Sequence, residues 1–296
     1  MAKRYEPYNF SIKAYLYSVM EDFRRDYSSF YDRNHEISFE NSTIPMYADP
    51  AALEHYLLRF SYAYCFYYTR MYMDILKGGS FSRGQRVKVA SLGCGDRIDY
   101  MGLCIAEQQD VKEMSFVYSG IDRAYWPVKY VRRRAKDFIS PLKTGGDDIL
   151  DFLRKGKNLD CSIYSFPMSL SELDNAYLAE ICNVFSSKPV LEDEVFLAAV
   201  TRENGALDEE RLERLAESLV GQGFRVTDRY SSDYERDMAE GTLISACSPY
   251  SDLGFGYPSK LYQELLTLNR DSGLRMPMMH TGYIRYDVLK LERGVR

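Results

Sequence analysis

The sequence has few of the residues that build metal sites and disulfide frameworks. Its three histidines, His35, His55 and His280, are far apart in a chain of 296 residues. The six cysteines show no C-x-x-C spacing, which zinc sites and redox motifs use. We therefore expect reduced cysteines and no bound metal ion.

Long apolar runs and an excess of positive charge are also missing. No apolar stretch reaches the roughly 18 residues that a membrane span needs, and residues 1–7 lack the apolar core of a signal peptide. The net charge of -5 argues against a surface that coats nucleic acid. We expect a cytoplasmic protein without a membrane partner, whose 46% hydrophobic content can bury a large core.

Strand and helix patterns alternate along most of the chain. Such alternation is typical of an α/β fold with a doubly wound sheet and helices on both faces. The predicted strands are 87–92, 115–121, 138–142, 161–166, 195–201, a closing antiparallel pair at 224–230 and 241–248, and, in the C-terminal extension, 282–291. The predicted helices are 98–109, 127–138, 175–185, 208–221 and, in the extension, 260–269.

Two of these strands end in residues that suit a nucleoside. The first ends in the turn Gly93-Cys94-Gly95, and the next ends in Asp122. Side by side, they would place a carboxylate where it can accept hydrogen bonds from both ribose hydroxyls. A Cβ at either glycine would collide with the nucleoside or forbid the backbone angles. The pattern predicts an adenosine pocket.

The details of the turn favour S-adenosylmethionine over a dinucleotide. Ile98 stands where the dinucleotide pattern has its third glycine, and Asp96 at the helix entrance would repel a pyrophosphate. The gap from Gly93 to Asp122 also exceeds the ~20 residues of that pattern. A nicotinamide-dependent oxidoreductase remains an alternative, which NADH binding would reveal.

Residues 85–248 resemble the class I S-adenosylmethionine-dependent methyltransferases, a Rossmann-like family. Leu92 to Gly95 is similar to their glycine loop, Asp122 to their ribose acid, and residues 145–148 to their third-strand acid near the adenine amine. The resemblance implies a mostly parallel seven-stranded sheet and an S-adenosylmethionine cofactor. Candidate cofactor-binding residues are Leu92, Gly93, Cys94, Gly95, Asp122, Arg123, Asp147, Asp148 and Ser165.

The acceptor of the methyl group is harder to predict. Residues 164–169, similar to the family's fourth-strand end, lack the Asn or Asp followed by Pro-Pro and an aromatic of base-amino methyltransferases. They also lack the Pro-Cys pair of cytosine-C5 enzymes. A small-molecule acceptor is the first expectation, with Tyr164, Ser165 and Glu172 as candidate catalytic residues because they lie where an acceptor would be oriented.

The chain outside the core suggests a cap and an extension. We expect a tyrosine-rich helical cap at 1–80, the cofactor-binding domain at 81–248, and an extension packed on the core at 249–296. A helix at 53–73 is apolar all round, which indicates burial in the core, or alternatively a lid whose tyrosines form the acceptor pocket.

Residues 129–136 carry five cations and suggest a second hypothesis. On a helix they could grip RNA phosphates, which would make the protein an RNA methyltransferase, or simply form a solvated face. Trp126, the only tryptophan, could stack on the adenine or anchor the start of that helix. A methyltransferase fold kept as a non-catalytic interaction module is the third hypothesis.

Overall fold

The computed structural model describes residues 11–33, 49–109, 112–124, 126, 130–131, 134, 136–140, 148–202, 206–232, 256–272, 274–279 and 284–294. None of the helices in these ranges has the length and apolar character to span a membrane. In chain order the elements are α1 (Ile12–Arg33), α2 (Pro50–Gly78), β1 (Arg86–Leu92), α3 (Ile98–Gln108), β2 (Ser115–Ile121), β3 (Phe138–Ile139), α4 (Ile149–Lys155), β4 (Ile163–Pro167), η2 (Leu170–Glu172), α5 (Asn175–Ser187), β5 (Glu194–Arg202), α6 (Ala206–Val220), β6 (Phe224–Ser231), α8 (Ser259–Ser272) and β7 (Ile284–Arg293).

The strands form one seven-stranded sheet in the order β3-β2-β1-β4-β5-β7-β6. The five strands from β3 to β5 pair in parallel, whereas β7 is antiparallel to both β5 and β6. The sheet is therefore mixed, in an α/β Rossmann-like arrangement. Its order reverses between β1 and β4, which is where open α/β sheets bind ligands, beyond the carboxyl ends of the strands.

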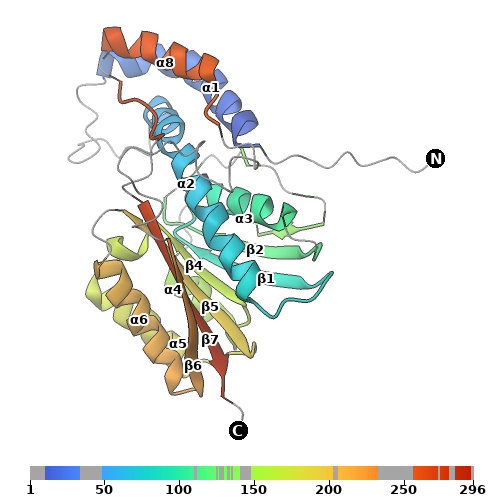
Figure 1. Cartoon of the computed structure of the whole chain (residues 1–296). Coiled ribbons are helices and arrows are strands. Elements are labelled where there is room, and N and C mark those ends of the chain that lie inside the picture. Colours follow the sequence, from blue (N-terminus) through green and yellow to red (C-terminus); the bar gives the residue numbers. More distant parts are fainter. Residues whose placement is uncertain are drawn as a thin grey trace.

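The C-terminal segment contributes to two layers of the molecule (Figure 1). Its strand β7 lies inside the sheet, between β5 and β6. Its helix α8 lies beside α1, where Arg24 and Glu264 form an ion pair at 2.6 Å. The strand predicted at 241–248 falls outside the described residues, and the partner of β6 is β7, so the sheet is not complete within residues 81–248.

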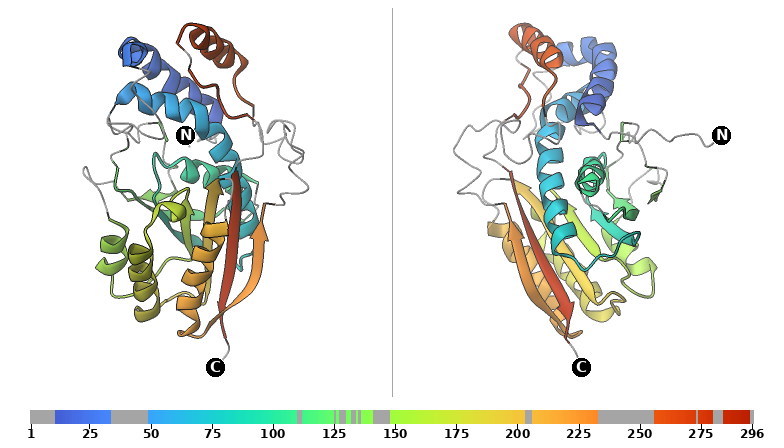
Figure 2. Two further views of the ribbon diagram at one scale, coloured as in Figure 1. Left: turned by 90° about the vertical axis from the view of Figure 1, so that its left-hand side faces the viewer. Right: turned by 45° about the vertical axis from the view of Figure 1, so that its right-hand side comes forward.

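The sheet separates two apolar clusters, as the side-chain alternation of a strand requires. On β5, Phe196 and Ala198 face the cluster shared with α1, α2 and α3, whereas Val195 and Leu197 face the cluster shared with α4, α5 and α6. Figure 2 shows the helices on either side of the sheet. Both faces are covered, which explains why β5 is apolar without interruption from Val195 to Val200.

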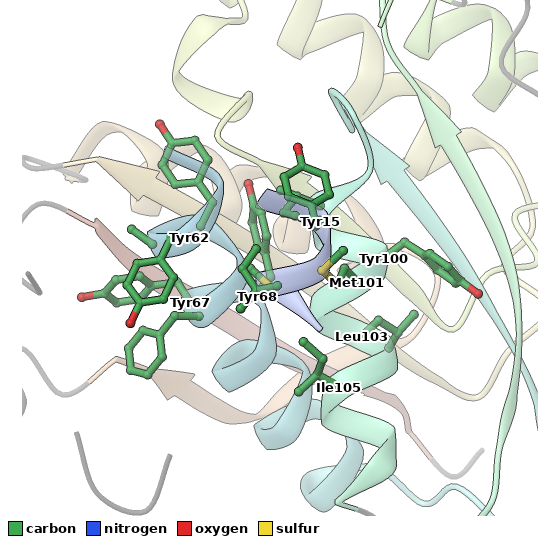
Figure 3. Close-up of a cluster of buried hydrophobic side chains, with 14 of the residues drawn as sticks. Tyr15, Tyr62, Tyr67, Tyr68, Tyr100, Met101, Leu103 and Ile105 are labelled. Atoms are coloured by element: carbon green, nitrogen blue, oxygen red, sulfur yellow. The ribbon is translucent and has the colours of Figure 1, made fainter. Parts of the chain in front are cut away.

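Helix α2 connects the cap to the sheet. It begins at Pro50, after the side chain of Asp49 accepts a hydrogen bond from the Ala52 amide at 2.9 Å. It packs very closely on α3, as the position of Gly102 shows: a Cβ there would lie 2.6 Å from the Cβ of Tyr68. Figure 3 shows Tyr15 and Tyr68 in the space between these helices. Most of α2 is buried, as its apolar sequence predicts.

The helix predicted at 127–138 is wrong for the residues that the structure describes there. Residues 130, 131, 134, 136 and 137 are in bends, a turn or irregular structure. Side-chain bonds hold this path: the Phe116 amide donates to Asp137 at 2.9 Å, and the Arg134 amide donates to the Tyr100 hydroxyl at 3.2 Å. These tertiary contacts replace the helical hydrogen bonds that local propensity favours.

Candidate functional site

A cavity of about 320 Å³ lies at the switch point of the sheet. The turn after β1, the residues after β2 and the end of β4 form its floor, and residues 56–68 of α2 cover it. This volume is at the lower end of the roughly 300 to 1,000 Å³ of small-molecule sites. The cavity therefore lies where open α/β sheets bind small ligands.

The turn after β1 is fastened to the end of β2. The amides of Gly93 and Cys94 both donate to the carbonyl of Ile121, at 2.7 and 3.0 Å. Gly93 and Gly95 have φ angles of +85° and +52°, the left-handed region that favours glycine. The turn thus exposes backbone to the cavity, as the sequence predicts.

The need for glycine at position 93 has a further cause. A Cβ there would lie 2.4 Å from the Cβ of Ser169, whereas one on Gly95 would be 3.5 Å from the Trp126 ring. The Ser169 hydroxyl also donates to the carbonyl of Leu92 at 2.5 Å. Gly93 therefore lets the turn after β1 contact the loop after β4, a reason that the sequence alone did not reveal.

Asp122 lies directly beside this turn. One of its carboxylate oxygens accepts from the Gly95 amide and the other from the Ala124 amide, both at 2.8 Å. Burial raises the pKa of Asp122, although these amide bonds act in the opposite direction. The carboxylate is thereby oriented in the wall of the cavity, together with Gly93, Cys94, Gly95 and Arg123 of the predicted cofactor-binding residues.

Asp96 also lines the cavity, although its place in the sequence predicts only that it repels a pyrophosphate. It is 4% exposed, accepts from the Tyr15 hydroxyl of α1, and accepts from the Ile98 amide at 3.3 Å. The Tyr15 hydroxyl is also 3.2 Å from the hydroxyl of Ser61 on α2. Burial raises the pKa of Asp96 to about 6, against the hydrogen bond from Tyr15. Asp96 thus connects both cap helices to the cavity.

Aromatic rings form the opposite wall. Tyr56, Tyr64 and Tyr68 of α2 line the cavity, and so does Trp126. Other tyrosines of α2 do not: Tyr62, for example, packs edge-on against Tyr257, with ring centroids 5.6 Å apart. One face of this helix therefore lies in the core, and another lies over the cavity.

The loop after β4 completes the lining with Pro167, Met168, Ser169, Glu172 and Leu173. Met168 has a φ of +59°, an unfavourable conformation for a residue with a side chain. Such strain persists where surrounding structure imposes it, and it is frequent at binding sites. Of the candidate catalytic residues, Glu172 is thus at the cavity.

The other two candidates, Tyr164 and Ser165, do not line the cavity. The ring of Tyr164 packs on Phe185 in the cluster under α5, with centroids 5.0 Å apart. The hydroxyl of Ser165 accepts a hydrogen bond from Tyr72 at 3.2 Å and is buried beneath the floor. Alternation along β4 sends these neighbours to opposite faces of the sheet.

Asp148 has a structural role in the described geometry. It is the N-cap of α4, accepting from the Leu150 amide at 2.8 Å, and it accepts from the Tyr177 hydroxyl at 2.7 Å. Burial raises the pKa of Asp148, but the hydrogen bonds from Tyr177 and Arg123 outweigh burial and lower the pKa below its ordinary value. Asp147 lies outside the described residues. No group of metal-ligating side chains occurs in the described parts of the chain.

The basic segment at 129–136 is only partly described, and its two described cations are paired within the protein. Arg134 is buried against Glu107 and Asp137, and Lys136 contacts Glu107 at 2.6 Å. These two cations neutralise buried carboxylates, which accounts for their charge without a phosphate ligand.

Comparisons with known proteins give structural similarity only. No family model matches the chain, and no curated protein matches it. Among solved structures, it is similar to a SAM-dependent methyltransferase from Archaeoglobus fulgidus, with 14% identity over 75% of this chain and 94% of the other, at a TM-score of 0.37.

Two further structures are similar along more of the chain. The plantazolicin methyltransferase BpumL shares 13% identity over 95% of both chains, with a TM-score of 0.35. The mitomycin 7-O-methyltransferase MmcR shares 10% identity over 96% of this chain and 70% of its own, with a TM-score of 0.38. At these values the fold assignment follows from the strand order itself.

Proposed function

We propose that the protein is an S-adenosylmethionine-dependent methyltransferase that acts on a small-molecule acceptor. The observation that carries the proposal is the contact between Asp122 and the Gly95 amide in the wall of a cavity at the switch point. A fixed carboxylate beside a glycine turn suits the two hydroxyls of a ribose. The enclosure by α2 favours an acceptor small enough to enter the cavity.

The residues present fit a sulfonium cofactor better than a dinucleotide. The first turn of α3, where a pyrophosphate would bind, is faced by the carboxylate of Asp96, which accepts from the Ile98 amide. The cation among the described lining residues, Arg123, forms an ion pair with Asp148 at 3.0 Å. A positively charged cofactor without phosphates meets neither obstacle.

The residues that line the cavity would have different roles in binding and methyl transfer. Asp122 would hold the ribose, backbone at 93–95 would contact the cofactor closely, and Trp126 and Ile149 offer apolar walls for the adenine. S-adenosylmethionine, when bound, supplies an electrophilic methyl group. Tyr64 and Tyr68 would exclude water and orient the acceptor, because methyl transfer depends mainly on positioning.

Binding of the cofactor tests the proposal directly. Trp126 is the only tryptophan and lines the cavity, so its fluorescence reports titration with S-adenosylmethionine or its demethylated product. We expect micromolar binding that Asp122→Ala abolishes. The control is Asp160→Ala, which removes a half-exposed carboxylate paired with Lys88 before β4 and should leave binding unchanged. Absence of binding by the folded protein, or preference for NADH, contradicts the proposal.

A further inference from the structure

A continuous row of four aromatic rings runs along α2, and three of them, all tyrosines, line the cavity. Tyr56, Phe60, Tyr64 and Tyr68 recur every four residues on α2, so they share one face of the helix. Successive ring centroids are 4.9, 5.5 and 6.3 Å apart, and Trp126 extends the row at 6.1 Å from Tyr56. The row presents faces and edges on which a planar molecule can stack.

The charges of the described lining residues are mostly negative. Asp96, Asp122 and Glu172 contribute carboxylates, and Arg123 contributes a guanidinium that is paired with Asp148. With Asp122 assigned to the ribose, Asp96 and Glu172 are the other acidic side chains among the described lining residues. Glu172 is exposed, whereas Asp96 is buried within the lining.

The surroundings of Asp96 suit a positively charged partner. Its described hydrogen-bond partners, the Tyr15 hydroxyl and the Ile98 amide, are neutral donors, so its charge is not balanced by them. A buried carboxylate gains from a nearby cation because burial disfavours its ionised form. Aromatic faces also attract cations. The acidic and aromatic features therefore favour the same kind of ligand.

We propose that the acceptor is a planar aromatic molecule with a positively charged nitrogen, its ring on the α2 aromatic row and its nitrogen near Asp96 or Glu172. The proposal rests on the proposed function, because it assigns Asp122 to the cofactor. It excludes acceptors whose recognition depends on a carboxylate or a phosphate.

Two probes of matched shape and opposite charge test this preference. Phenethylamine and 3-phenylpropanoate share a phenyl ring and a two-carbon arm, and neither absorbs at the excitation wavelength of tryptophan. We titrate each into the full-length protein saturated with S-adenosylhomocysteine and follow Trp126 fluorescence. The amine should bind at least about tenfold more tightly, a difference that one favourable charge contact supplies. Equal binding, tighter binding of the carboxylate, or no binding of either probe overturns the proposal.

Variants separate the ring contribution from the charge contribution. Tyr64→Leu should weaken both probes to a similar extent, whereas Asp96→Asn should reduce the preference for the amine. Glu172→Gln, at an exposed position, keeps the charge test valid if Asp96→Asn fails to fold. Tyr17→Leu, at a residue that is 41% exposed on α1, is the matched control and should change neither affinity. Unchanged preference in both charge variants overturns the assignment.

The same titrations distinguish failure of this inference from failure of the proposed function. Binding of S-adenosylhomocysteine is measured first and tests the cofactor assignment alone. The amine and carboxylate are then compared with and without that ligand. A protein that fails to bind S-adenosylhomocysteine but prefers the amine contradicts the methyltransferase and supports the cationic site. The reverse outcome keeps the methyltransferase and removes the cationic acceptor.

Discussion

The Cβ of Ser169 is 2.4 Å from the position that a Cβ on Gly93 would take. This contact brings the turn after β1 against the loop after β4, on the two strands that flank the switch point. We expect Gly93→Ala to lower the free energy of unfolding by about 2 to 4 kcal/mol, from overpacking and from a left-handed alanine. Urea unfolding measures the loss, and the same variant should bind S-adenosylmethionine poorly.

A second substitution tests whether Ser169 causes the loss. Ser169→Gly removes the clashing Cβ and should restore about 1 to 3 kcal/mol in the Gly93→Ala background. Ser169→Ala removes the same hydrogen bond to Leu92 and the hydroxyl oxygen, which would lie 2.7 Å from the new Cβ, but it keeps the closer Cβ of residue 169, so it should restore less. Equal rescue by both substitutions would show that the hydroxyl, and not the Cβ, is responsible.

A substitution at Gly102 tests the close contact between α2 and α3 in the same way. Its Cβ would lie 2.6 Å from the Tyr68 Cβ and 2.9 Å from the Thr69 amide nitrogen, and backbone cannot move aside cheaply. Gly102→Ala should destabilise the protein by about 1 to 3 kcal/mol despite the higher helix propensity of alanine. Gly221→Ala is the control, because no atom lies within 4 Å and its backbone is not left-handed. A stabilised Gly102→Ala variant in thermal unfolding contradicts the packing.

The sequence predicted the glycine turn and Asp122 because both depend on local chemistry and on the rule that neighbouring parallel strands end together. Asp96 was visible but was interpreted only through its effect on pyrophosphate. Its contact with Tyr15 joins residues 81 positions apart, which no local pattern reveals. The spacing of Tyr56, Tyr64 and Tyr68 is helical, but only the fold decides which face of α2 meets the cavity.

Non-local contacts determine two features that local patterns do not predict. The segment after Trp126 has helical propensity, yet the bonds of Arg134 and Asp137 to Tyr100 and Phe116 fix another path. The strand next to β5 comes from the end of the chain, at 284–293, so its pairing joins segments about ninety residues apart. The sequence of such a segment predicts a strand, but it does not indicate which strand lies beside it in the sheet.

The buried carboxyl of Asp99 should make the stability of the protein depend on pH. It is buried beneath the cavity and accepts from Tyr118 and Ser91, both at 2.7 Å, and burial raises its pKa to about 6 from an ordinary value of 3.8. Since the unfolded chain ionises first, this carboxyl lowers stability as pH rises from about 4 to 6, by about 3 kcal/mol in full. Relative to Asp99→Asn, the wild type should lose unfolding free energy over this interval. Parallel pH curves for the two proteins would contradict the raised pKa.

Arg134 and Lys136 test whether the described cations of the basic segment are structural. Arg134 is 9% exposed in its side chain and lies between Glu107 and Asp137, which are 5% and 0% exposed, whereas Lys136 is 42% exposed. Arg134→Met leaves buried carboxylates without their guanidinium and should cost about 3 to 5 kcal/mol in urea unfolding. Lys136→Met breaks an ion pair that water screens and should cost under about 1 kcal/mol. Added salt should reduce the loss of unfolding free energy caused by Lys136→Met more than the loss caused by Arg134→Met, because buried ion pairs are screened less. Equal, small losses in both variants would indicate that Arg134 is solvated, and would restore the hypothesis that this segment binds phosphates.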